Sequence, residues 1–210
     1  AKWTYLIEEI AAEPCLSDIM PALICWSGMN NYAFEIIRRA FDAGTIGIDS
    51  LYPLRFGAIL ANVDQRLVTD FLQCLVAKKT VDTAELALNL AYSHSRAGGT
   101  IPLETRYDIV IQDALFSSDS SWNSFTDFCW RDMALALLTD NPNYASELAS
   151  FITSILLSNA RLEESYYSEV LFETARIDPN STWNAIAPSV DAENYSVISC
   201  FIGRFEHDRK

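Results

Sequence analysis

The sequence contains little glycine and proline, with seven residues of each among 210. An all-β chain needs turn residues about every 8–12 positions, so this scarcity favours helices over strands. There are two histidines and no Cys-x-x-Cys pair, which disfavours a structural zinc site. Half of the residues are hydrophobic and 12% are aromatic, so the chain is too apolar to be disordered.

The sequence also lacks a long apolar run. Its longest stretch without a charged residue covers 19–34 and is interrupted by Pro21, Gly28 and two asparagines. A transmembrane helix needs about 20 mostly apolar residues, so we expect no membrane span. The N-terminal segment, as it stands, has no apolar core behind a basic start and is not a signal peptide. Because the chain begins with Ala1, we expect that it was processed or belongs to a larger protein.

The cysteines are few and widely spaced. Their odd number and their positions in apolar segments are typical of buried free thiols rather than of a disulfide framework. Free thiols persist in a reducing compartment, so we predict a cytoplasmic protein. The cysteines are Cys15, Cys25, Cys74, Cys129 and Cys200.

Basic residues are scarce, with 15 Lys and Arg against 28 Asp and Glu and a net charge of −13. The acidic excess is concentrated in the second half, where 14 acids between Asp108 and Glu193 face only Arg131, Arg161 and Arg176. Binding a nucleic-acid backbone requires clustered Lys and Arg, so direct nucleic-acid binding is disfavoured. The acidic stretch could instead steer a basic partner, although solvated helix faces carry such charges too.

Apolar residues recur with the period of an α-helix. In residues 64–79 they occupy positions three and four apart, and in 81–96 they cover a wider arc that indicates packing on two sides. Asn141-Pro142 and Asp178-Pro179 are typical helix starts, with a capping side chain before a proline. We expect helices over residues 3–13, 30–43, 64–79, 81–96, 103–116, 124–139, 143–158, 164–177, 180–189 and 191–205.

A turn followed by an amphipathic helix recurs near residues 30, 64, 102, 141 and 179, in steps of about 34 to 40 residues, the size of one helix pair in α-helical repeats. In this period and these turns the chain resembles HEAT-like or armadillo-type repeats over nearly its whole length. The resemblance implies an all-α fold, a right-handed α-solenoid of about five antiparallel helix pairs forming one repeat domain over residues 1–210. The alternative is an irregular helical bundle.

No catalytic motif is present. There is no Gly-x-Ser-x-Gly elbow and no glycine-rich loop followed by Lys-Ser or Lys-Thr. Gly44 and the pair Gly98-Gly99 follow helical segments and are interpreted as helix C-caps, where glycine accepts a positive φ. His94 lies near the end of the 81–96 helix, where the helix dipole favours a protonated imidazole, and it has no visible partner for acid–base work. We therefore predict no catalytic residue, cofactor or metal.

Two features stand out as candidates for recognition: the acidic second half, and the serine-rich loop 117–123 with its tryptophan. An exposed tryptophan would anchor an interface, whereas one folded onto the next helix would be part of the core. We predict a non-catalytic module that binds a protein partner with a basic surface. An acidic inhibitor that imitates nucleic acid and a helical enzyme with an unrecognised carboxylate site remain as alternatives. The candidate partner-binding residues are Asp113, Asp119, Trp122, Asp127, Glu163 and Glu164.

Overall fold

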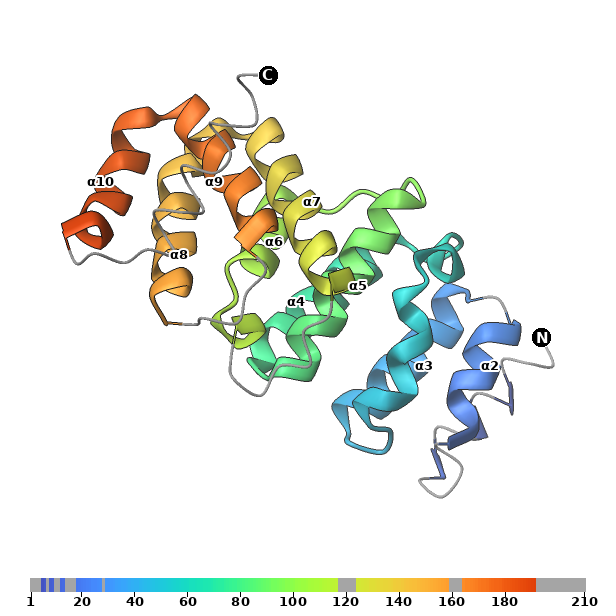
Figure 1. The fold of residues 1–210 in the computed structure, drawn as a ribbon. Coiled ribbons are helices and arrows are strands. Elements are labelled where there is room, and N and C mark those ends of the chain that lie inside the picture. Colours follow the sequence, from blue (N-terminus) through green and yellow to red (C-terminus); the bar gives the residue numbers. More distant parts are fainter. Residues whose placement is uncertain are drawn as a thin grey trace. The chain divides into compact units, whose positions relative to one another are not determined.

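The computed structural model describes residues 5–6, 8–9, 12–13, 18–27, 29–116, 124–158 and 164–191. These described residues form α-helices and 3-10 helices with no strand, which confirms the predicted all-α class (Figure 1). No helix among them is long and apolar enough to span a membrane. The chain divides into two compact units, unit 1 (Ala1–Thr105) and unit 2 (Arg106–Lys210).

Unit 1 is organised around a buried central helix, α5. Each residue from Thr83 to Ala91 is buried, which confirms the prediction that this helix packs on more than one side. It packs against α4 and against the 3-10 helices η2 and η3. The elements are α2 (Met20–Ser27), α3 (Asn31–Asp42), η2 (Ile48–Arg55), η3 (Gly57–Leu60), α4 (Gln65–Lys78), α5 (Val81–Arg96) and the start of α6 (Leu103–Val110).

The helices of unit 1 begin at side chains that bind the first free backbone N–H groups. Asn30 accepts a hydrogen bond from the Ala33 amide before α3, and Asp64 accepts one from the Arg66 amide before α4. Phe71 of α4 then packs edge-on against Phe34 and Phe41 of α3, at ring-centroid distances of 5.4 and 6.1 Å. Caps and aromatic packing together position α3 beside α4.

Unit 2 has its core where α7, α9 and η4 meet. Trp130 of α7 and Tyr167 of α9 are fully buried, with ring centroids 4.9 Å apart, and Phe116 of η4 packs edge-on against both. Helix α9 packs against α7, α8 and α10, and α8 also packs against α10. The elements are η4 (Asp113–Phe116), α7 (Ser124–Asp140), η5 (Pro142–Tyr144), α8 (Ala145–Ser158), α9 (Glu164–Ile177) and α10 (Pro179–Asp191).

Most of the predicted helices are present within two or three residues of their expected bounds, and both predicted Asx-Pro starts are confirmed. Asn141 accepts a hydrogen bond from the Asn143 amide, with Pro142 at the first position of η5. Asp178 accepts one from the Ser181 amide at the start of α10. The predicted 191–205 helix lies beyond the described residues, and of the 3–13 helix the described residues 5–6, 8–9 and 12 are helical.

Three segments differ from the prediction. Helix α2 was not expected, because Pro21 interrupts the pattern, yet proline is tolerated in a first helical turn. Residues 48–60 form the 3-10 helices η2 and η3 where a loop was expected at the start of this segment. The predicted 103–116 helix ends at Val110, whose carbonyl oxygen accepts a hydrogen bond from Trp130 Nε1 at 2.9 Å. The solenoid arrangement and the single repeat domain stay predictions.

Candidate functional site

A shallow hollow lies between the N-terminal halves of α3 and α4. It has a volume of about 420 Å³ and is open to solvent. Three of its lining side chains are acidic and one is basic, so its wall is polar rather than apolar. The lining residues are Asn31, Glu35, Asp64, Arg66, Leu67 and Asp70.

A second hollow, of about 430 Å³, lies on the other side of the same turns of α4. Its far wall is the segment that leads into α6, where Thr100 donates a hydrogen bond to the Gln65 side chain. Arg66 and Asp70 line both hollows and therefore form the ridge between them. The lining residues are Gln65, Arg66, Thr69, Asp70, Thr100, Ile101 and Pro102.

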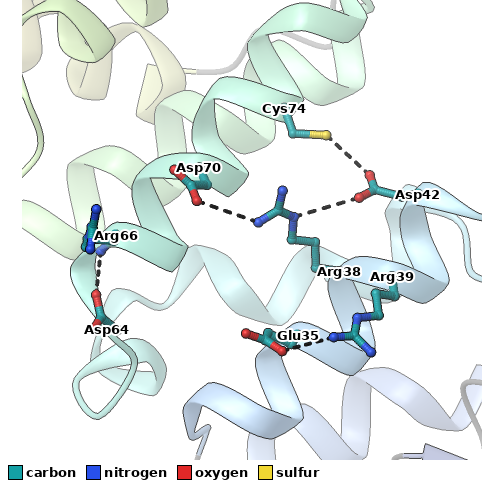
Figure 2. Close-up of polar contacts among 8 residues, drawn as sticks. All are labelled: Glu35, Arg38, Arg39, Asp42, Asp64, Arg66, Asp70 and Cys74. Atoms are coloured by element: carbon teal, nitrogen blue, oxygen red, sulfur yellow. Dashed lines mark hydrogen bonds and ion pairs between the residues drawn. The ribbon is translucent and has the colours of Figure 1, made fainter.

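Opposite charges are matched along α3 and α4 (Figure 2). Arg38 lies between Asp42 of its own helix, at 3.8 Å, and Asp70 of α4, at 4.0 Å. Arg39 binds Glu35 one turn earlier at 3.2 Å. Such exposed pairs contribute only about 0–1 kcal/mol each. Their main effect is to leave the first hollow close to neutral, despite its acidic wall.

The only thiol in this cluster is that of Cys74, which donates a hydrogen bond to Asp42 at 3.3 Å (Figure 2). Partial burial raises the pKa of Cys74, and the hydrogen bond to the Asp42 carboxylate raises it further. A nucleophilic cysteine needs a lowered pKa, whereas both of these effects favour the neutral thiol of Cys74. The described residues contain no group of His, Cys, Asp and Glu side chains that could hold a metal ion.

In unit 2 every described arginine is already paired with acids of the same unit. Arg106 binds Asp140 at 2.6 Å, and Arg176 binds Glu173 at 3.3 Å. Arg131 binds Asp132 at 2.7 Å and Glu169 at 3.5 Å. The Arg131 guanidinium also lies over two aromatic rings, those of Phe128 and Tyr166. Its side chain is only 18% exposed, so it has a packing role as well as a charge.

Three acids of unit 2 that form no ion pair with a described residue lie on its surface. Asp108, Asp113 and Glu147 are exposed and form no ion pair with a described residue. Glu147 accepts a hydrogen bond from the Tyr107 hydroxyl, and Tyr107 is stacked on Tyr144 with ring centroids 4.5 Å apart. Burial raises the pKa of Tyr107 to about 12, with Glu147 as the next cause, so the tyrosine adds no charge of its own.

The predicted partner-binding residues have different environments. Asp113 is exposed at the start of η4, as a recognition residue must be. Asp127 is 6% exposed and accepts a hydrogen bond from the buried Tyr167 hydroxyl at 3.1 Å, so it belongs to the interior of unit 2 and is not part of a binding surface. The side chain of Glu164, the first residue of α9, and all of Asp119, Trp122 and Glu163 lie outside the described residues.

Sequence reasoning did not identify the hollows beside α4. The sequence property that could have indicated them is the constant separation of complementary polar residues. In the structure Asn31 accepts a hydrogen bond from the Asp64 amide, Arg38 pairs with Asp70, and Asp42 accepts a hydrogen bond from Cys74, and each pair is 32 or 33 positions apart. Comparisons with protein-family models, with curated proteins and with solved structures gave no match. The residues that the structure describes define an all-α protein.

Proposed function

We propose that this protein is a non-catalytic, helical-repeat binding module that recognises a protein partner with a basic surface. The acids of unit 2, rather than the hollows of unit 1, form the recognition surface of this proposal. No cofactor or metal takes part. The cytoplasm, a reducing compartment, suits the exposed free thiol of Cys25.

Two kinds of contact support the HEAT-like part of the proposal. Within unit 1, polar links join residues 32 to 35 positions apart on α3, α4 and the segment leading into α6, as in the Gln65–Thr100 and Gln73–Thr105 pairs. Within unit 2, α7 packs against α9 and α8 packs against α10, so both contacts join α-helices two places apart. A solenoid of helix pairs would have such contacts, because each repeat packs on the next.

The binding proposal rests on the charge of unit 2, which is predominantly negative. Its described arginines all form ion pairs with acids of the same unit, and no lysine occurs between Lys79 and Lys210. The negative charges of Asp108, Asp113 and Glu147 are therefore not offset by an ion pair with any described cation of unit 2. Such a field attracts a basic partner and raises its rate of association.

A charge-reversal experiment tests the proposal. The triple variant Asp108→Lys, Asp113→Lys, Glu147→Lys is used as bait beside the natural chain, and captured proteins are identified by mass. A matched control reverses three exposed acids of unit 1, Glu13, Asp18 and Asp49, and changes the net charge by the same amount. Capture is repeated at about 50 and 500 mM salt, because screening over a Debye length of about 10 Å or less weakens surface attraction.

We expect the natural chain and the unit 1 control to capture a basic protein in stoichiometric amount and to release it at high salt. The unit 2 variant should not capture it. Helicity by circular dichroism should be the same for all three baits. Equal capture by the unit 2 variant would contradict the proposal. Competition by duplex DNA for the captured protein would favour the acidic-inhibitor alternative instead, because that alternative occupies a nucleic-acid groove.

A further inference from the structure

Helix α5 ends in a Schellman motif that places His94 under a glycine turn. The Gly99 amide donates to the His94 carbonyl oxygen at 2.9 Å, and the Gly98 amide donates to the Ser95 carbonyl oxygen at 3.1 Å. Gly98 has φ +90, the left-handed conformation that this motif requires. The motif places Gly99 against a side chain in the last turn of α5, which here is His94.

The His94 ring is closely covered by this turn. A Cβ built on Gly99 would lie 2.2 Å from His94 Nε2, so the glycine backbone rests directly against the imidazole. His94 is 4% exposed, and neither ring nitrogen has a hydrogen-bond partner among the described residues. A buried imidazole without partners is a costly arrangement, which the surrounding packing must hold in place.

Burial lowers the pKa of His94 below its usual value, and burial is the only cause. The sequence suggested the opposite tendency, because the helix dipole favours a protonated imidazole, but desolvation outweighs the dipole here. The turn itself, residues 97–102, contains no titratable side chain, and no charge on the neighbouring elements contributes to the shift. The titratable and charged side chains on α5 and on the elements packed against it are Asp82, Glu85, Tyr92 and Arg96 on α5, Arg66, Asp70, Cys74 and Lys78 on α4, and Asp49, Tyr52 and Arg55 on η2.

The same turn forms one wall of the second hollow beside α4. Thr100 donates to Gln65, and Ile101 and Pro102 line the hollow with it. Ile101 is buried, so lifting the turn would expose an apolar side chain as well as the imidazole. The position of the turn therefore couples His94 to the shape of this hollow.

We propose that His94 and the 97–102 turn form a pH-sensitive latch: protonation of the buried imidazole lifts the turn and remodels the hollow between α4 and residues 100–102. An imidazolium has two N–H donors that need partners, and the residues that the structure describes offer none in the closed form. Lifting a short turn supplies water to the ring at a lower cost than unfolding unit 1, because local openings need less energy than global ones. This latch is independent of the acidic surface of unit 2.

The expected pH dependence follows from proton linkage. In the open form His94 regains a pKa near its ordinary value of about 6.5, whereas in the closed form its pKa is lower. The open form thus binds more protons, and closure is fully stable above about pH 6.5 and is lost as the pH falls. Because the ordinary pKa is about 6.5, the opening equilibrium rises between about pH 7.5 and pH 5 by at most roughly 30-fold, the limit for an imidazole that stays neutral in the closed form.

Amide hydrogen exchange tests the latch in the full chain. The protection factor of the Gly99 amide, which binds the His94 carbonyl, is compared at about pH 7.5 and pH 5, and we expect it to fall by up to roughly 30-fold. The chain offers an internal control at the end of α3, where the Thr45 amide binds the Ala40 carbonyl in the same motif without a histidine. Thr45 should keep its protection.

Two variants complete the test. His94→Phe fills the same site without a titratable nitrogen and should keep Gly99 protected at both pH values; His94→Met serves if the larger ring does not fit. In a His207→Gln background the only remaining imidazole is that of His94, so its titration can be followed by NMR. Equal loss of protection at Gly99 and Thr45, the same loss in the non-titrating variant, or an ordinary His94 titration curve would each overturn the latch.

Discussion

Replacing Gly99 with alanine measures how tightly the α5 turn packs on the His94 ring. The new methyl group would lie 2.2 Å from Nε2 and 2.4 Å from Cδ2 and Cε1, which is closer than carbon atoms approach in proteins. His94 is almost fully buried, so either the ring or the turn has to move. Overpacking of this kind costs about 1–3 kcal/mol. We expect Gly99→Ala to lower the free energy of unfolding by that amount, measured by urea denaturation with circular dichroism.

A double-mutant cycle shows whether the ring is the cause. In a His94→Ala background the methyl group has space, and Gly99 does not have a positive φ, so alanine introduces no backbone strain. There Gly99→Ala should change the stability by less than about 1 kcal/mol, or increase it slightly through the unfolded chain. The coupling energy between the two positions should therefore be about 1–3 kcal/mol.

Gly98→Ala is the matched control for this cycle. Its Cβ would meet no atom within 4 Å, but its φ of +90 is unfavourable for alanine and costs about 1–2 kcal/mol. That cost lies in the backbone, so it should be the same with His94 or with alanine at position 94. If Gly99→Ala also cost the same in both backgrounds, the packing argument would be refuted.

Two further predictions concern buried groups in unit 2. Trp130→Phe removes the N–H group that donates a hydrogen bond to the Val110 carbonyl at the end of α6. We expect the free energy of unfolding, measured by urea titration, to fall by about 1–3 kcal/mol. A fall below about 0.5 kcal/mol would argue against a stabilising role for this hydrogen bond. Alkylation by iodoacetamide, mapped by mass spectrometry, should modify Cys25 well before Cys129. Cys25 is exposed, whereas Cys129 is fully buried and burial raises its pKa to about 12; equal rates at the two thiols would contradict this assignment.

The helices with a strong apolar period were predictable because local patterns specify them. The bounds of α5 coincide with the predicted residues 81–96, since Thr80 caps its start and a glycine turn ends it. The caps at Asn141 and Asp178 were predictable for the same reason, because a side chain and an amide two or three positions away are enough to form them. The cap of α4 follows the same rule, because Asp64 accepts a hydrogen bond from the Arg66 amide two positions later.

The segments that were missed depend on distant partners. Leu51 and Leu54 are fully buried in η2, which packs against α5, so the 3-10 form of residues 48–55 follows from a contact about 30 or more positions away. The end of α6 at Val110 likewise depends on Trp130, which donates to its carbonyl from the next helix. No local pattern carries this information.

The candidate surface shows the same division. Composition alone established that the second half is acidic, whereas the absence of direct nucleic-acid binding stays a prediction. Which acids face solvent was decided by packing: Asp113 is exposed, whereas Asp127 is buried against Tyr167, 40 positions later. Tertiary contacts also decided that Arg106 pairs with Asp140, that Arg131 pairs with Glu169 and that His94 is buried. Periodicity, capping and net charge are local or additive properties that the sequence determines by itself, whereas burial and pairing depend on residues that only the folded chain brings together.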